Sequence, residues 1–348
     1  MKIAVDAMGG DTAPASVIEG AVMAAREAGI AVILVGDPAQ IETHLARLPA
    51  AGVQIEVVPA SQRVEMHESP SQVVRRKRDS SIWVATELVK KGAAAAVVSA
   101  GNTGASMATA FFILGPIKGV ERPAIATTLP TLQGTTLLID VGANVDCKPL
   151  HLFQFALMGS EYAERVLNKP RPKVGLLSIG EEDTKGNEVT KETFKILKAS
   201  ALNFIGNVEG RDIYAGTADV VVCDGFIGNV ALKVSEGLAE SMGKVLRREI
   251  EAAPLGWLGY LLLRGAFRRF RRTVDYAEYG GAPLLGVNGV SIISHGRSSP
   301  RAIRNAIGVA KTLAENQINE RIRADIQDSM AIYSRAHEEF LRAERGEA

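Results

Sequence analysis

Four short turns rich in Gly, Asn, Asp and Thr each follow an apolar run of β type and lead into helix-like sequence. Glycine lets the backbone come close to a ligand, and a new helix N-terminus presents free N–H groups to an anion. Ligands of open α/β sheets bind at the carboxyl ends of the strands. We therefore expect one shared anion-binding crevice. In chain order, the turns are the first turn (101–104), the second turn (141–146), the third turn (180–187) and the fourth turn (225–229).

Two side chains in these turns are candidates for catalysis. Lys185 lies in a turn too polar to be core, and a lysine there can neutralise a phosphate or polarise a carbonyl. Asn229 follows Gly228 at a strand-to-helix junction, where its amide can donate to an oxyanion. The alternatives are a solvated surface lysine and a helix-capping asparagine. The candidates for substrate or phosphate binding are Asn102, Thr103, Gly104, Asn144, Asp146 and Gly228.

Several common kinds of catalytic chemistry are disfavoured. The chain has no Walker A sequence, no G-x-G-x-x-G and no H-E-x-x-H, and none of its five histidines lies in the four turns. A nucleophilic role for Cys147 or Cys223 is also disfavoured, and Cys223 lies in an apolar strand. We expect Asp140 and Asp224, which end strands, to orient neighbouring groups. No pattern in the sequence requires a metal ion or another cofactor.

The composition is ordinary for a globular chain. Of 348 residues, 47% are apolar and 23% are charged, and the net charge of +1 gives no argument for nucleic-acid binding. The two cysteines form no C-x-x-C motif, which argues against a disulfide framework or a thiolate zinc site and fits a reducing compartment. We find no secretory signal pattern and no apolar run that approaches the roughly 20 residues of a membrane span.

Alternating strand and helix patterns predict the fold class. We expect an α/β protein with three α/β/α layers around one largely parallel, mixed sheet. No stretch is polar enough for an interdomain linker, so residues 1–348 are predicted to form a single catalytic unit or two intertwined lobes. Strands are predicted over 2–6, 31–35, 53–58, 94–99, 135–140, 173–179, 203–206, 219–223 and 290–294.

A basic amphipathic segment over 252–273 breaks the composition. Residues 254–263 are almost wholly apolar, and residues 264–272 then carry five arginines and no acidic residue. The segment can lie in a membrane interface or bind an acidic partner, or it can pack against a partner subunit; these roles can coexist. A second basic stretch, 75–78, is either a charged helix face or a docking patch. The candidate contacts to carrier protein or membrane are Trp257, Arg264, Phe267, Arg268, Arg269, Arg271 and Arg272.

Seven tracts in order carry a resemblance to a known family. Together they resemble the phosphate acyltransferase (PlsX) family, the acyl-ACP:phosphate acyltransferases of bacterial phospholipid synthesis. Each tract is weak alone, and the seven in order are specific over nearly the whole chain. They are VDAMGGD (5–11), KRDSS (77–81), SAGNTGA (99–105), DVGANVD (140–146), GEEDTKGN (180–187), DGFIGNV (224–230) and YGGAPLLG (279–286).

The resemblance implies an activity, a fold and partners. Members pass a fatty acyl group from the thioester of acyl carrier protein to inorganic phosphate, and a membrane acyltransferase then uses the acyl phosphate to acylate glycerol 3-phosphate. The fold is similar to that of isocitrate/isopropylmalate dehydrogenases and phosphotransacetylases, usually as a homodimer. The implied location is the cytoplasm, at the inner face of the membrane, with the region near 254–272 touching membrane and carrier protein.

The residues in the turns are compatible with this chemistry. Phosphate is already a nucleophile, so the enzyme needs to hold it against the thioester carbonyl and stabilise the oxyanion. We expect Lys185 to bind phosphate or the oxyanion and Asn229 to complete the oxyanion hole. The alternatives are a phosphotransacetylase-like enzyme acting on acyl-CoA, a metal- and NAD-dependent dehydrogenase of the same fold group, and a non-enzymatic membrane adaptor built around 254–272.

Overall fold

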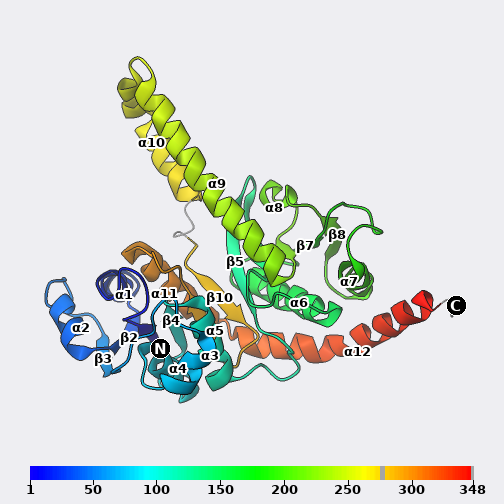
Figure 1. Ribbon diagram of the computed structural model, residues 1–348, viewed down its shortest axis with the longest axis horizontal. Helices are drawn as coiled ribbons and strands as arrows, with labels where there is room; N and C mark the ends of the chain where they lie inside the picture. The colour runs from blue at the N-terminus through cyan, green and yellow to red at the C-terminus, as the bar shows by residue number, and fades with distance from the viewer. Residues whose placement is uncertain (275–278, 346–348) are drawn as a thin grey trace.

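The computed structural model describes residues 1–274 and 279–345, without the side chains of 271–274 and 344. In the described residues, eleven strands form one mixed sheet (Figure 1). From one edge to the other, the strands are β3 (Ile55–Pro59), β2 (Ala31–Gly36), β1 (Lys2–Asp6), β4 (Ala96–Ser99), β11 (Val290–Ile293), β10 (Ala282–Leu285), β5 (Ala124–Thr131), β6 (Gly134–Ile139), β9 (Val220–Val222), β7 (Val174–Leu177) and β8 (Phe204–Val208).

Helices cover both faces of the sheet and confirm the predicted three-layer α/β/α class. The first face is covered by α1 (Ala15–Ala28), α2 (Pro38–Leu45), α6 (Pro149–Arg165), α7 (Glu188–Ala199), α11 (Pro300–Glu315) and α12 (Ile318–Glu344). The opposite face is covered by α3 (Pro70–Arg76), α4 (Ser81–Lys90), α5 (Thr103–Leu114), α8 (Asp212–Ala215) and the first turns of α9 (Gly225–Ala252).

The central strands bury both of their faces. In β1, Ile3 and Val5 pack into the core under α1 and α11, whereas Ala4 packs into the core under α4 and α5. Successive side chains of a strand point to opposite faces, so a strand with helices on both sides must be apolar at every position. This is why the predicted strands appear in the sequence as continuous apolar runs.

The sheet consists of two parallel halves that run in opposite directions. The strands β3, β2, β1, β4 and β11 are parallel to one another (the first half), as are β6, β9, β7 and β8 (the second half). Between them, β10 is antiparallel to β11 and to β5, and β5 is antiparallel to β6. The carboxyl ends of the first half therefore point away from those of the second half.

This reversal changes where the four turns lie. The first turn follows β4, whereas the second, third and fourth turns follow β6, β7 and β9. The four turns therefore do not all follow strands of one parallel set, because β4 runs opposite to β6, β7 and β9. That they share one crevice stays a prediction. The two groups are connected by α9: it starts at the fourth turn, and the charges of its Lys233 and Glu236 act on His295, which lies in the first half near Asp11.

All nine predicted strands are observed, but β5 and β10 were not predicted. The β5 sequence AIATTLPT contains three threonines and a proline, which interrupt the apolar run that marks the other strands. It forms an antiparallel hairpin with β6, and this hairpin accounts for part of the change in direction.

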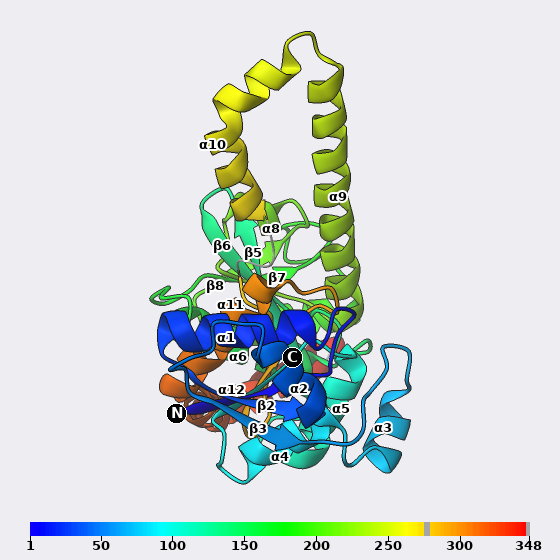
Figure 2. The same ribbon diagram turned by 90° about the vertical axis from the view of Figure 1, so that its left-hand side faces the viewer.

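An arm extends from the body of the molecule. The distal part of α9 and α10 (Gly256–Val274) lie side by side and project away from the sheet (Figures 1 and 2). Between them is a groove of about 270 Å³ lined by Leu246, Leu263, Ala266, Phe267 and Phe270. Within the described residues, no helix is long and apolar enough to cross a bilayer.

Candidate functional site

The second and fourth turns lie against each other. The Gly225 N–H donates to the Asn144 carbonyl at 2.7 Å. A Cβ placed on Gly142 would lie 2.8 Å from Nδ2 of Asn229, so the Asn229 amide contacts the backbone of the second turn directly. A Cβ on Gly228 would lie 1.9 Å from the Asp140 carbonyl oxygen. Only glycine permits this approach at 228, and it brings the exposed Asn229 side chain to the junction of the two turns.

Asp140 organises the second turn from beneath. Its Oδ1 accepts N–H groups from Ile125 (3.0 Å), Gly142 (3.2 Å) and Ala143 (3.1 Å). Its Oδ2 accepts the backbone N–H of Asn144 (2.7 Å) and the Asn144 side-chain amide (3.0 Å). Burial raises the pKa of Asp140, and these hydrogen bonds oppose that shift. The expected orienting role of Asp140 is confirmed, and the N–H groups of 142–144 are already bonded to protein.

The fourth turn also begins with a capping aspartate. The Asp224 side chain accepts the Ile227 N–H at 2.8 Å and caps α9, as expected of a residue that orients its neighbours. Asn229 lies five residues further on, inside α9, so it is not the residue that caps this helix. Asp146, at the end of the second turn, is exposed.

The third turn leaves the sheet beside the fourth, since β7 and β9 are adjacent and parallel. Lys185 is exposed, and its aliphatic chain lies over Gly180, where a Cβ would be 2.9 Å from Cγ of Lys185. Among the described residues its ammonium group has no ion pair. Beneath the turn, Oγ of Ser178 and Oδ1 of Asn207 are buried and have no hydrogen-bond partner in the described structure.

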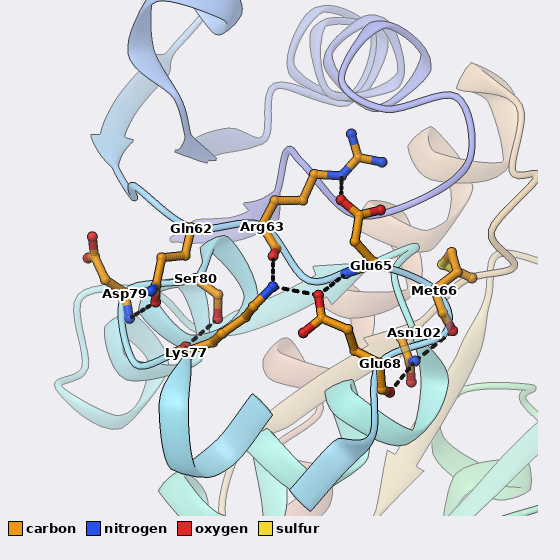
Figure 3. A network of polar contacts seen from close by, with 9 residues as sticks. All are labelled: Gln62, Arg63, Glu65, Met66, Glu68, Lys77, Asp79, Ser80 and Asn102. Carbon is orange, nitrogen blue, oxygen red and sulfur yellow. Dashed lines mark hydrogen bonds and ion pairs between the residues drawn. The ribbon is translucent and has the colours of Figure 1, made fainter. Parts of the chain in front are cut away.

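In the first turn, Asn102 is committed to internal contacts. Its Oδ1 accepts the Ala105 N–H at 2.9 Å and so caps α5, while Nδ2 donates to the carbonyls of Met66 (2.7 Å) and Glu68 (3.0 Å) (Figure 3). Asn102 therefore holds the 61–69 loop against α5. Thr103 is exposed, and Gly104 lies under Pro70, where a Cβ would be 2.7 Å from the ring.

The 61–69 loop is fixed by a network around Lys77 (Figure 3). The Lys77 ammonium donates to the Arg63 carbonyl at 2.6 Å and pairs with Glu68, and this pairing lowers the pKa of Glu68. Arg78 lies over the Trp83 ring, 5.7 Å from its centroid. Two of the four cations in the basic stretch 75–78 thus have contacts within the fold, and Arg75 and Arg76 are exposed.

Asp6, at the end of β1, was not predicted as a site residue. It is fully buried, and its Oδ2 accepts the Ser99 hydroxyl at 2.7 Å while Oδ1 accepts the Met8 N–H at 3.3 Å. Burial raises the pKa of Asp6, whereas hydrogen bonds from Ser81 and Ser99 act to lower it. A Cβ on Gly9 would lie 2.4 Å from Oδ2 of Asp6. The sequence pattern could have indicated this position, since Gly9 and Gly10 follow the end of a strand much as the glycines of the four turns do.

Neither cysteine is activated as a nucleophile. Burial raises the pKa of the Cys147 thiol to about 12 and that of Cys223 well above its ordinary value, with the nearby Asp140 and Asp224 charges adding to both shifts. A thiolate is the reactive form of cysteine, so neither side chain is ready to attack a carbonyl near neutral pH.

The predicted contacts to carrier protein or membrane lie on α10. Trp257 is 70% exposed near the tip of the arm. Phe267 instead faces α9 across the groove and stacks on Tyr260, with ring centroids 5.6 Å apart, so it is partly engaged within the arm. Arg264, Arg268 and Arg269 lie on exposed positions of α10. The side chains of Arg271 and Arg272 lie outside the described residues.

Comparisons with known proteins agree over nearly the full chain. The family described as "Fatty acid synthesis protein" matches residues 1–321. The phosphate acyltransferase of Citrifermentans bemidjiense is 57% identical over 329 residues, which cover 94% of each chain. That of Geobacter sulfurreducens is 56% identical over 333 residues and 96% of each chain.

Solved structures show the same fold at low sequence identity. A phosphotransacetylase from Streptococcus pyogenes has a TM-score of 0.61 at 17% identity, covering 91% of this chain and 94% of its own. The EutD phosphotransacetylase from Staphylococcus aureus has a TM-score of 0.59 at 16% identity, covering 90% of this chain and 94% of its own. The expected phosphotransacetylase-like α/β fold is confirmed.

Proposed function

The chain belongs to the phosphate acyltransferase family, and we propose that it moves a long-chain fatty acyl group from the thioester of acyl carrier protein to inorganic phosphate. The product, an acyl phosphate, serves phosphatidic acid synthesis when a membrane acyltransferase passes the acyl group to glycerol 3-phosphate. The observation that carries the site assignment is the contact between the Asn229 amide and the backbone of the second turn.

The reaction needs no covalent enzyme intermediate. An oxygen of phosphate attacks the thioester carbonyl, and the carbonyl π electrons move to its oxygen to give a tetrahedral oxyanion. When the oxyanion collapses, the C–S bond breaks, its electron pair leaves with sulfur, and the acyl phosphate and the carrier thiol remain. A thiolate is a good leaving group, since a free thiol has a pKa of about 8.5, so a strong general acid is not required. The raised pKa values of Cys147 and Cys223 support direct attack by phosphate.

Lys185 and Asn229 are proposed to stabilise the reacting groups. The third and fourth turns leave adjacent parallel strands, and Lys185 presents an unpaired ammonium group from an exposed position within the described structure. In this proposal Lys185 neutralises phosphate or the oxyanion, and Asn229 donates its amide to the oxyanion. The phosphate site is proposed to lie at the second and fourth turns, where it is lined by Asn144, Asp146 and Gly228. The first turn, with Asn102, Thr103 and Gly104, is proposed to line the carrier-protein side of the crevice.

The arm is proposed to hold the partners. Carrier proteins of this type are acidic, so the basic face of α10, with Arg264, Arg268 and Arg269, suits docking of carrier protein and of anionic lipid. The exposed apolar residues of α9 and the Trp257 tip suit a homodimer contact and a membrane surface. The enzyme would then work in the cytoplasm, peripherally at the inner face of the membrane, beside the glycerol-3-phosphate acyltransferase.

The first experiment measures release of carrier thiol from palmitoyl-ACP with and without phosphate, while labelled phosphate is followed into a lipid-extractable product. Phosphate-dependent release with label in the lipid is expected. Release without phosphate would indicate a thioesterase. If palmitoyl-CoA is used and palmitoyl-ACP is not, the enzyme is a phosphotransacetylase-like one, and the carrier-protein part of the proposal fails.

The site assignment is tested with Lys185→Ala and Asn229→Ala. Removing one oxyanion donor typically lowers kcat by about 100- to 1000-fold, and we expect a loss of this size for each variant at saturating phosphate. Lys191→Ala, an exposed lysine on α7, is the matched control and should keep its turnover. If both site variants fold and keep near-normal turnover, Lys185 and Asn229 do not have the proposed catalytic roles.

The arm is tested by charge reversal. Arg268→Glu with Arg269→Glu should reduce sedimentation with anionic vesicles and should weaken carrier-protein binding, which is itself expected to fall steeply with added salt. Arg342→Glu on α12 is a control outside the arm. Unchanged sedimentation would mean that α10 packs against protein rather than lipid.

A further inference from the structure

The loop between α5 and β5, residues 115–123, is tied to the second turn and to α6 at several points. Gln154, in the first turns of α6, donates its Nε2 to the Gly119 carbonyl at 2.7 Å and accepts the Glu121 N–H on its Oε1 at 2.9 Å. The side-chain amide of Asn144 donates to the Pro123 carbonyl at 2.8 Å. The backbone is therefore anchored on both sides of Arg122, one residue before it and one residue after it.

The buried, neutral His151 also holds this loop, through a hydrogen bond to Glu121. Nδ1 of His151 accepts the Lys148 N–H at 3.1 Å, so in the neutral ring the proton lies on Nε2, which donates to Oε2 of Glu121 at 3.0 Å. Burial lowers the pKa of His151, which keeps the ring neutral near pH 7. Within the described residues, Glu121 pairs with His151 and forms no ion pair with Arg122.

Arg122 itself presents an uncommitted charge beside the second turn. Its side chain is exposed, and within residues 1–274 and 279–345 its guanidinium forms no ion pair. Its charge opposes the burial that raises the pKa of the Cys147 thiol and adds to the burial that lowers the pKa of His151, so the guanidinium acts on residues on both sides of the start of α6.

The second turn needs a cation if phosphate is to bind there. The N–H groups of 142–144 already donate to Asp140. Asp140, Asp146 and Asp224 all contribute carboxyl groups to this region, and their charges would repel a phosphate dianion. An arginine provides planar, paired N–H donors that match phosphate oxygens and keeps its charge at every working pH.

We propose that Arg122 binds the phosphate acceptor next to the second turn, and that His151 and Gln154 are positioning residues that hold its loop in place. The proposal rests on the use of phosphate stated above. Arg122 would be a second cation at the site, on the other side from Lys185. Arg122 precedes β5, which lies next to β6, whereas Lys185 follows β7, and β9 lies between β6 and β7 in the sheet.

The kinetic test compares Arg122→Gln, Arg122→Lys and the matched control Lys118→Gln, an exposed cation of the same loop. We expect Arg122→Gln to raise the KM for phosphate at least tenfold while the KM for the acyl donor changes less than twofold. Arg122→Lys should recover part of the loss because it keeps the charge, and Lys118→Gln should behave like the parent protein. An unchanged phosphate KM in Arg122→Gln, or a rise confined to the acyl donor, overturns the proposal.

A binding test separates this proposal from the identity of the acyl donor. Phosphate that binds the native protein raises its Tm with concentration, and no acyl donor is needed for the measurement. Arg122→Gln should need at least tenfold more phosphate for the same rise in Tm, and Gln154→Ala should show a smaller shift in the same direction. If the parent protein responds to phosphate and Arg122→Gln responds equally, Arg122 is not a phosphate ligand, whichever thioester the enzyme uses.

Discussion

The two halves of the sheet each place a buried aspartate at the end of a central strand, and the two aspartates are held differently. Asp6 ends β1, and the side-chain hydroxyls of Ser99 and Ser81 are among its partners. Asp140 follows β6 and accepts five N–H donors, four from the backbone and one from the Asn144 amide. Burial raises the pKa of both carboxyl groups.

The two aspartates differ in whether their hydrogen-bond partners can switch between donating and accepting. A hydroxyl can donate or accept, so Ser99 can satisfy Asp6 in either protonation state. An N–H group can only donate, so every partner of Asp140 requires an acceptor. The loop at Asp6 can therefore adapt to a change at Oδ2, which faces Ser99, while Oδ1 keeps the Met8 N–H. The second turn, in contrast, depends on an oxygen at both positions of residue 140.

The largest expected effect comes from replacing one carboxyl oxygen by an amide. In Asp140→Asn, an NH₂ group must face either the three donors at Oδ1 or the two at Oδ2. A buried donor without an acceptor costs about 1–3 kcal/mol, so we expect Asp140→Asn to lower the free energy of unfolding by about 4 kcal/mol. Asp6→Asn should cost about 1 kcal/mol or less, because Ser99 can turn to accept the new amide. Urea denaturation of both variants measures the difference.

Equal losses in the two variants would contradict this account. The Asn144 amide cannot rescue Asp140→Asn at low cost, because flipping it would break its hydrogen bond to the Pro123 carbonyl. The comparison also has a functional readout: Asp140→Asn should disturb the second turn and raise the KM for phosphate, whereas Asp6→Asn should leave that KM nearly unchanged.

The next effect tests how tightly the fourth turn packs on Asp140. A Cβ on Gly228 would lie 1.9 Å from the Asp140 carbonyl oxygen and 2.9 Å from Sγ of Cys223. Overpacking of this kind costs about 1–3 kcal/mol, and here the backbone must move, so we expect Gly228→Ala to be destabilising in that range and to lose activity. Thermal unfolding and turnover measure both.

Gly237→Ala is the matched control for that substitution. Gly237 lies on the same helix, α9, and a Cβ there would meet no atom within 4 Å. Alanine in an exposed helix interior is favoured over glycine by about 0.5–1 kcal/mol, so this variant should be slightly more stable than the parent. A similar loss at both glycines would mean that flexibility of α9, rather than contact with Asp140, explains the result.

Much of the fold was predictable because its central strands are covered on both faces. The strands β1, β2 and β4 are largely continuous apolar runs. The helices that follow β2 and β11 have clear N-caps, Asp37 for α2 and Ser299 for α11. The strand β5 was missed because its threonines and Pro130 resemble a loop, and the chain reversal that it causes depends on pairing with β10 and β6. Strand direction is a tertiary property that local composition does not encode.

The site was predictable in its turns and less so in its contacts. Glycine-rich sequence after a strand located 142–144 and 225–229, and the capping and orienting aspartates followed from their place at strand ends. The loop that carries Arg122 was not singled out, because it is anchored by Asn144 of the second turn and by His151 and Gln154 of α6, which lie 22 to 32 residues beyond Arg122 in the chain. No local pattern marks such long-range anchors.

A third, largely buried carboxyl group, that of Glu161, extends the comparison to a site with no backbone N–H donor among the described residues; its ion-pair contact is Arg165, whose Nε lies 3.7 Å from Oε2 of Glu161. Glu161 on α6 faces Asp325 on α12, with Glu164, Arg165 and Asp328 nearby. Burial, followed by the Asp325 charge, raises the pKa of Glu161 from its ordinary value of 4.5 to about 7, and the pKa of Asp325 is raised as well. Unlike Asp140, this pair is best satisfied when the two carboxyl groups share a proton.

The sign of the resulting pH dependence follows from proton uptake. Between pH 4.5 and about 7 the folded state binds more protons than the unfolded state, so the contribution of Glu161 is fully present below that window and is lost as the pH rises through about 7. The slope is at most about 1.4 kcal/mol per pH unit for one proton. Glu161→Gln, which stays neutral and can still donate to Asp325, should flatten this part of the stability profile.

Urea denaturation at pH 5, 6, 7 and 8 measures that slope for the parent, for Glu161→Gln and for the exposed α12 control Glu338→Gln. The parent and the control should lose stability together as the pH rises, and Glu161→Gln should lose less. If all three profiles are parallel, the α6–α12 contact does not depend on a shared proton. In that case Glu161 would stay ionised without backbone N–H donors, and the proposed difference between Glu161 and Asp140 would not hold.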